Sequence, residues 1–283
     1  DGKTLTVAAW YITHAHGDHH GCVPTFAELY RDQCTIDAFY YHYPSYEEIQ
    51  KYLSGCGVDD TWGAVDWIPT WLLPKFKNKE GGPTKGIQCN TRHSGKCNYA
   101  FDFDEVHIEI LLTFDDIMWA VDNVSGRYSG TSAYEGRVFS NKTFKELIND
   151  NFNETSMVFR ASAGGKSFMI TGDINYVGGY MLNKFHDANA KDSGQYYSLK
   201  TDYIQVSHHG HYGLPKNTYN RIDPDVALWP VGSADYNTTT YQNLICTRQW
   251  FSDMGTASYP AYAGPHVFEI PVVRTDGAVK IPA

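Results

Sequence analysis

The chain has 283 residues and a formal net charge of −9, and its 23 lysines and arginines are scattered along it rather than grouped. It therefore carries no sign of the basic patch typical of nucleic-acid-binding proteins. No apolar run reaches the roughly 20 residues of a membrane-spanning helix, and no signal peptide is visible, which leaves the compartment open between cytoplasmic and exported. The length suits one domain over residues 1–283, with irregular insertions at about 55–95 and 115–150.

Six cysteines are too few for a disulfide scaffold and lack the paired short spacings of a zinc ribbon. Unpaired thiols are expected, and a bridge between Cys89 and Cys97 is the alternative if the protein is exported.

A strand-like run at residues 5–12 leads directly into four histidines and an aspartate within residues 14–20. Each histidine needs a partner for both ring nitrogens, so this cluster is a costly way to build a core. In an extended or tightly turned segment, alternation directs His14 and His16 to one point. The next turn brings Asp18 and His19 toward a second point nearby. The cluster predicts a site for one metal ion or for two adjacent ones.

The residues after this cluster predict alternating helices and strands. A helix is expected over 23–30, a strand over 35–41 and a helix over 45–53, whose start has the capping-box pair Ser45 and Glu48. The chain therefore begins as a β-α-β-α unit.

Later segments predict three more strands that matter for the site. An alternating strand is expected at 105–112. A hairpin of strands 155–161 and 166–171 turns at Gly164 and Gly165 and leads to Asp173. A helix is expected at 143–149, where the second insertion ends, and another at 180–186, after Asp173.

A last buried strand at 203–207 leads to His208, His209 and His211. Three strands therefore end in an Asp or a His next to a glycine. This is the pattern expected when ligands converge at one edge of a sheet.

The motif His14-Ala15-His16-Gly17-Asp18-His19, followed by residues 168–173 and 206–210, resembles the metallo-β-lactamase superfamily. Within it, the chain is most similar to the hydrolase domain of ComEC-type DNA-uptake proteins and their soluble relatives. The resemblance implies an αββα sandwich with a dinuclear metal centre, usually zinc and sometimes manganese or iron.

The resemblance also implies a ligand set: His14 and His16 on the first metal, Asp18 and His19 on the second, Asp173 bridging, and His208 as the last ligand of the second metal, with His209 the alternative. Many members have a further histidine on the first metal. Here the corresponding segment offers Asn151, Asn153 and Glu154 instead, which predicts a weaker or exchangeable first metal. Several strands that usually precede the histidine motif are absent from this chain, so its first sheet is expected to be incomplete.

Two such cations can lower the pKa of a shared water and polarise a phosphoryl or carbonyl oxygen. Asp18 would both bind metal and orient the nucleophile, and His209 or His211 would stabilise the oxyanion or protonate the leaving group.

The expected activity is hydrolysis of a phosphodiester or phosphate ester. The acidic charge favours a small substrate, such as a choline-type ester, over a long polyanion. The alternatives are an amide or lactone ring hydrolase and a domain that binds metal or ligand without turnover.

Overall fold

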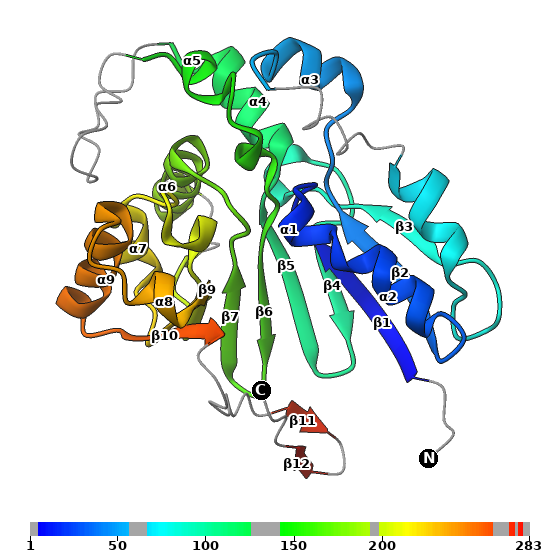
Figure 1. Ribbon diagram of the computed structural model, residues 1–283. Coiled ribbons are helices and arrows are strands. Elements are labelled where there is room, and N and C mark those ends of the chain that lie inside the picture. Colours follow the sequence, from blue (N-terminus) through cyan, green and yellow to red (C-terminus); the bar gives the residue numbers. More distant parts are fainter. Residues whose placement is uncertain are drawn as a thin grey trace.

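The computed structural model describes residues 5–56, 67–125, 142–192 and 198–262, together with two short strands, β11 (Val272–Arg274) and β12 (Gly277–Val279). Two β-sheets lie face to face, and helices cover the outer face of each, so the layer order is α/β/β/α (Figure 1). The αββα sandwich predicted from the sequence is confirmed. Residues 57–66 and 126–141 of the two predicted insertions lie outside the described residues.

The first sheet has three parallel strands in the order β1 (Leu5–Ile12), β2 (Cys34–Tyr41) and β3 (Lys85–Gln88). The sequence predicts the first two strands but not β3, which lies in a segment expected to be irregular. Its four residues form a strand because they pair with residues 38–41 of β2. A short edge strand of this kind depends on tertiary pairing rather than on its own propensity.

The second sheet has seven strands in the order β10-β9-β8-β7-β6-β5-β4. They are β4 (Ala100–Phe103), β5 (Val106–Leu112), β6 (Val158–Ala163), β7 (Lys166–Ile170), β8 (Tyr203–Gln205), β9 (Val226–Gly232) and β10 (Ala257–Tyr262). Strands β4 to β7 pair antiparallel, and β7 to β10 pair parallel. The predicted hairpin joins β6 to β7. Gly164 and Gly165 adopt φ of 57° and 75° in its turn, a backbone that glycine reaches without steric cost.

Aromatic rings from both sheets fill the space between them. Tyr11 of β1 stacks on Tyr40 of β2 with ring centroids 4.6 Å apart, and it lies 4.9 Å from Phe159 of β6. Tyr40 meets Phe101 of β4 edge-on at 4.7 Å. Each such pair adds about 0.5–1.5 kcal/mol beyond the burial of its area. These contacts hold the sheets face to face.

The structure describes nine α-helices in these parts of the chain. They are α1 (Gly17–His20), α2 (Cys22–Tyr30), α3 (Tyr46–Tyr52), α4 (Phe114–Asn123), α5 (Phe144–Ile148), α6 (Tyr176–Asp192), α7 (Lys216–Ile222), α8 (Ser233–Tyr236) and α9 (Gln242–Met254). Short turns of helix are η2 (Ile68–Leu72), η3 (Leu73–Lys75), η4 (Arg92–Ser94), η5 (Phe152–Thr155) and η6 (Ser207–Gly210). Helix α2 covers the first sheet through Phe26, whose ring lies 5.1 Å from that of Trp10. Helices α6, α7 and α9 lie over the second sheet (Figure 1), where Phe251 packs against Trp229 of β9.

The second insertion was expected to be irregular from about residue 115, but it begins with helix α4. Thr113 and Asp116 form a capping box at its N-terminus. Phe114, Ile117 and Ala120 are fully buried at helical spacing. The helix forms because this apolar face packs into the core.

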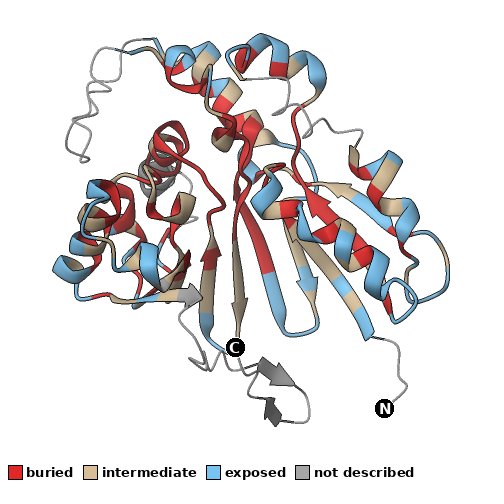
Figure 2. Ribbon diagram, viewed as in Figure 1, coloured by how far each residue is buried: buried red, intermediate tan, exposed pale blue. Residues whose placement is uncertain are grey.

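The strands are buried most deeply at one end. In β1, Leu5 is 60% exposed and Ile12 is 2% exposed. Figure 2 shows the same gradient, with buried residues concentrated where β1 and β7 end. Backbone hydrogen bonds join the segments beyond these ends: Met157 N donates to Thr13 O at 2.8 Å, and His208 N donates to Gly172 O at 3.1 Å. The three predicted motifs therefore meet at one edge.

Cys89 and Cys97 are thiols and form no disulfide with each other. This agrees with the expectation of unpaired cysteines.

Candidate metal centre

His14 and His16 lie in the turn between β1 and α1. His14 is fully buried, and its Nε2 is 3.1 Å from Nδ1 of His16. His16 has extended backbone angles and is the N-cap of α1, so the helix starts immediately after it. The extended segment brings two ring nitrogens to one point.

Asp18 and His19 lie in α1 and face the segment that follows β7. His19 Nε2 is 3.1 Å from Asp173 Oδ1 and 3.6 Å from Asp18 Oδ2. The side chain of Asp18 is 57% exposed, whereas that of Asp173 is 3% exposed. The cluster therefore has a buried side at Asp173 and an open side at Asp18.

Gly172 allows the chain to place Asp173 between the histidines. It has φ of 54°, and a Cβ there would lie 2.9 Å from the Cβ of Thr13 and 3.0 Å from the Cβ of Ser156. Ser156 Oγ accepts a hydrogen bond from Asp173 N at 3.0 Å. Backbone approach this close requires glycine.

His209 lies in η6, the turn after β8, and its ring reaches the carboxylates of Asp18 and Asp173. Its Nε2 is 2.9 Å from Asp18 Oδ2 and 3.5 Å from Asp173 Oδ2. Its Nδ1 donates to the carbonyl oxygen of Pro230 at 2.8 Å. A proton held on Nδ1 leaves the Nε2 lone pair of the neutral ring available for a metal.

His208 points elsewhere. Its Nδ1 is 3.2 Å from the amide of Asn175, and its Nε2 is 3.1 Å from the amide of Asn153. Both histidines have left-handed backbone, with φ of 50° at His208 and 53° at His209, and this tight turn sends their rings to different partners. The sequence prediction preferred His208 as the last ligand, but the structure brings the alternative, His209, to the carboxylates.

Two sets of side chains converge closely enough to hold a metal ion, with ligand atoms within 4.8 Å of one another. We call them group one (His14, His16 and Asp173) and group two (Asp18, His19, Asp173 and His209). Asp173 belongs to both. Asp173 Oδ1 and His19 Nε2 are buried and make no hydrogen bond of good geometry within the described chain. Imidazole nitrogens with carboxylate oxygens suit zinc, manganese or iron, so the cluster fits metal binding.

The protonation of these residues follows from burial and from neighbouring charges. Burial alone would raise the pKa of Asp173, but the imidazoles of His19 and His209 hold it well below its usual value. Burial lowers the pKa of His14 well below its usual value and that of His208 to about 4, so both rings are neutral. Burial also opposes charge on His209, but Asp173 raises the pKa of this ring to about 9. Without metal, the proton of His209 partly neutralises the carboxylates.

His211 belongs to neither group. Its Nδ1 is 2.9 Å from the side-chain amide of Asn243. Burial and the nearby His209 lower the pKa of His211. The structure therefore places this ring beside α9 rather than among the convergent ligands.

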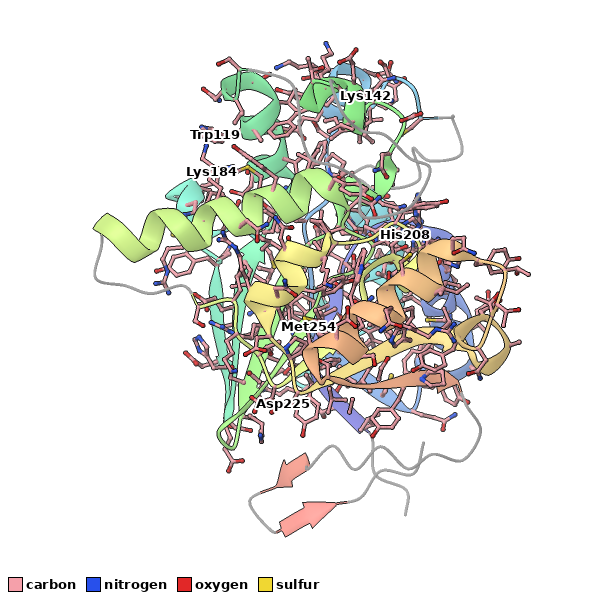
Figure 3. All side chains as sticks on the ribbon, turned by 90° about the vertical axis from the view of Figure 1, so that its left-hand side faces the viewer. Trp119, Lys142, Lys184, His208, Asp225 and Met254 are labelled. Atoms are coloured by element: carbon pink, nitrogen blue, oxygen red, sulfur yellow. The ribbon has the colours of Figure 1, made fainter. Side chains whose placement is uncertain are left out.

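A pocket of about 250 Å³ opens beside the cluster, with His208 in its wall. Tyr176 and Tyr212, which follow Asp173 and His211 in sequence, also line it. Figure 3 shows His208 near the N-terminal end of α6, on the side of the molecule that carries Lys142, another lining residue. A pocket of this size admits a small molecule.

Sequence reasoning missed Asn175, one of the two amides beside His208. Asn175 is 4% exposed and follows Asp173 by two residues. Nothing in the local sequence distinguishes it from a turn residue. It also missed Glu154 as a helix cap: this carboxylate is buried and accepts hydrogen bonds from the backbone N–H groups of Val177 and Gly178 at the start of α6.

Within the part of the chain that the structure describes, no helix is long and apolar enough to cross a membrane.

No protein-family model and no curated protein matches the chain. Among solved structures, it is similar to the metallo-beta-lactamase fold protein YhfI from Bacillus subtilis, with 13% identity and a TM-score of 0.43 over 90% of this chain and 75% of that one. It is also similar to a mutant of the β-hydroxylase CmlA, with 9% identity and a TM-score of 0.44 over 92% of this chain and 44% of that one. Similarity at this level leaves the activity to be judged from the residues of this chain.

Proposed function

We propose that the chain is a metal-dependent hydrolase that cleaves a small phosphodiester or phosphate ester. The observation that carries this proposal is the convergence of the two groups on one buried carboxylate, Asp173. A buried carboxylate shared by two sets of convergent ligands could serve two adjacent divalent cations.

In this proposal, His14 and His16 would hold the first cation, and Asp18, His19 and His209 would hold the second. Asp173 would serve both, and zinc is the first choice of metal. Two divalent cations at these positions would supply Lewis acidity and a water of lowered pKa.

Residues of the chain would orient the attacking water and accept its proton. Asp18 lies at the open side, where its carboxylate can orient the attacking water and accept its proton. In the metal-free protein, the protonated His209 lies 2.9 Å from that carboxylate and holds it in place. Asp173 is buried on the opposite side of the cluster.

A small ester is favoured for two reasons. The adjacent pocket measures about 250 Å³, which suits a small substrate. The net charge of −9 opposes the binding of a long polyanion. The phosphoester class itself comes from the resemblance of the sequence motifs to the ComEC-type hydrolase domain.

The test is metal analysis of the purified protein, followed by assays on bis(p-nitrophenyl) phosphate, p-nitrophenylphosphorylcholine, a lactone and a cephalosporin. We expect two metal equivalents and turnover of a phosphoester. Asp18→Ala should lower kcat by about 10²–10⁴-fold. Asp102→Asn, at an exposed carboxylate paired with His107, is the control and should leave kcat unchanged. Bound metal without turnover of any phosphoester would contradict the proposal.

A further inference from the structure

The pocket beside the cluster is built from segments that also border the two groups. Residues 150–154 contribute to its wall, and Phe152 of this segment packs its ring 5.3 Å from that of His16 of group one. His208 also lines the pocket and directly precedes His209 of group two, and the centroids of these two rings are 6.4 Å apart. A chemical group bound in the pocket therefore lies next to the residues that would hold the metal.

The wall of this pocket is mainly acidic. Of the described residues that line it, Glu146, Asp150 and Glu154 are acidic and Lys142 is basic. Glu146 and Asp150 are exposed, so solvent and ligands reach them. Glu154 is buried, and burial raises its pKa to about 7, so it adds only part of a charge. The pocket therefore has a negative potential that opposes an anionic group and favours a cationic one.

Hydrogen bonds fix two of these carboxylates in the wall. Thr143 N and Oγ1 donate to Glu146 Oε2 at 2.7 and 2.8 Å. Val177 N and Gly178 N donate to the carboxylate of Glu154 at 2.9 and 3.0 Å. Backbone N–H and hydroxyl donors orient a carboxylate without carrying a full positive charge. The negative charge of Glu146 therefore stays at a defined position beside the pocket.

Two tyrosines line the same pocket. Tyr176 begins α6, and Tyr212 lies in the loop after η6. The face of a tyrosine ring attracts an ammonium group, and this attraction adds to that of a carboxylate. Carboxylates and tyrosine rings around one small pocket are therefore the combination expected for a bound amine.

We propose that the substrate is a phosphoester that carries an ammonium group, and that the pocket binds this group through Glu146, Asp150 and the two tyrosine rings. This inference rests on the proposed function and names its substrate class. A phosphodiester with one ammonium group has no net charge, so the charge of −9 on the chain does not oppose its binding. The pocket volume of about 250 Å³ limits the group to a small amine.

The test compares two esters of the same shape. p-Nitrophenylphosphorylcholine carries a quaternary ammonium group, and p-nitrophenyl 3,3-dimethylbutyl phosphate has carbon in place of that nitrogen. We expect kcat/KM to be about tenfold higher for the choline ester. In the double variant Glu146→Gln with Asp150→Asn, the ratio should fall to about twofold, the contribution left to the tyrosine rings. Glutamine can still accept the capping hydrogen bonds of α5.

Asp102→Asn removes an exposed carboxylate on β4 and is the control, which should keep the full ratio. Equal kcat/KM for the two esters in the unmodified chain would overturn the proposal. A ratio that is unchanged in the double variant would also overturn it.

A binding measurement separates this inference from the proposed function. Calorimetric titration of the full chain with phosphorylcholine and with 3,3-dimethylbutyl phosphate needs no turnover. Tighter binding of phosphorylcholine that is lost in the double variant would support the ammonium site even if no ester is cleaved, in which case only the proposed function fails. Equal binding, or tighter binding of the uncharged analogue, would overturn the site. If the double variant does not fold, the comparison of the two ligands in the unmodified chain decides alone.

Discussion

His209 Nε2 lies 2.9 Å from Asp18 Oδ2, although 191 positions separate the two residues in the chain. The contact joins the first turn after β1 to the loop after β8. It closes group two, which no single segment of the chain could form.

Removal of His209 should weaken metal binding at group two. His209→Ala leaves Asp18, His19 and Asp173 as ligands. We expect the affinity for the second zinc to fall by at least about 100-fold, since even the loss of an outer hydrogen-bond partner costs about 10–100-fold. Competition titration with a zinc chelator measures the effect. His107→Ala, at an exposed histidine paired with Asp102, is the control and should bind zinc normally. Equal affinity in the two variants would exclude His209 as a ligand.

Metal binding should release a proton from His209. Its pKa of about 9 in the metal-free protein means that the ring is protonated at pH 8. A metal on Nε2 must displace that proton, so affinity should fall about tenfold for each pH unit below 9. Calorimetric titrations at pH 8 in buffers of different ionisation enthalpy count the protons released. His209→Ala should release one proton fewer. A count that is the same in both proteins would contradict this assignment.

Asp115 and Asp116 should give opposite dependences of stability on pH. Burial raises the pKa of Asp116 from 3.8 to about 6, so between these values the folded chain binds a proton that the unfolded chain does not. Relative to Asp116→Asn, the free energy of unfolding should therefore fall as pH rises from 4 to 6, by about 3 kcal/mol in total.

The neighbouring carboxylate provides the control of opposite sign. Hydrogen bonds from His42 and Lys96 hold the pKa of Asp115 well below its usual value. Relative to Asp115→Asn, the wild-type chain should gain stability as pH rises through the usual carboxyl pKa and lose it as pH falls. Urea unfolding of the three proteins at several pH values measures both trends. The same sign in both comparisons would refute the prediction.

Gly210 should tolerate no side chain. It has φ of 83°, and a Cβ there would lie 2.1 Å from Cζ3 of the fully buried Trp229 and 2.8 Å from Cδ2 of Leu244. Gly210→Ala combines overpacking with left-handed strain, so we expect a loss of about 3 kcal/mol in the free energy of unfolding.

Gly165 separates the two causes of this loss. It has φ of 75° with no atom within 4 Å of an added Cβ, so Gly165→Ala carries the strain without the clash. We expect it to cost about 1 kcal/mol. Urea unfolding compares the two variants. Equal losses would mean that Trp229 moves aside at little cost.

Several elements could be read from local sequence because their signals are local. The capping box of Ser45 and Glu48 forms as predicted, with Ser45 N donating to Glu48 Oε2 at 2.7 Å. The turn at Gly164 and Gly165 places β7 as predicted. Helix α4 also has a local signal, the capping-box pair of Thr113 and Asp116.

Strand β3 carried no such signal. Its four residues, Lys85–Gln88, include a glycine and only one β-branched side chain, and they become a strand by pairing with the edge of β2. That pairing joins residues 47 positions apart, such as Ala38 and Lys85. A short stretch of sequence around β3 therefore gives no indication of this pairing.

The sequence by itself determined the kinds of side chain at the site and the strands that carry them, because histidines and aspartates placed after apolar strands form a local pattern. Only the tertiary structure shows which of His208 and His209 faces the carboxylates. Adjacent residues in a left-handed turn face different sides, and their partners come from distant elements. Pro230 of β9 and Asp18 of α1 hold His209, whereas Asn153 and Asn175 hold His208. Contacts between remote segments therefore select which histidine faces the carboxylates.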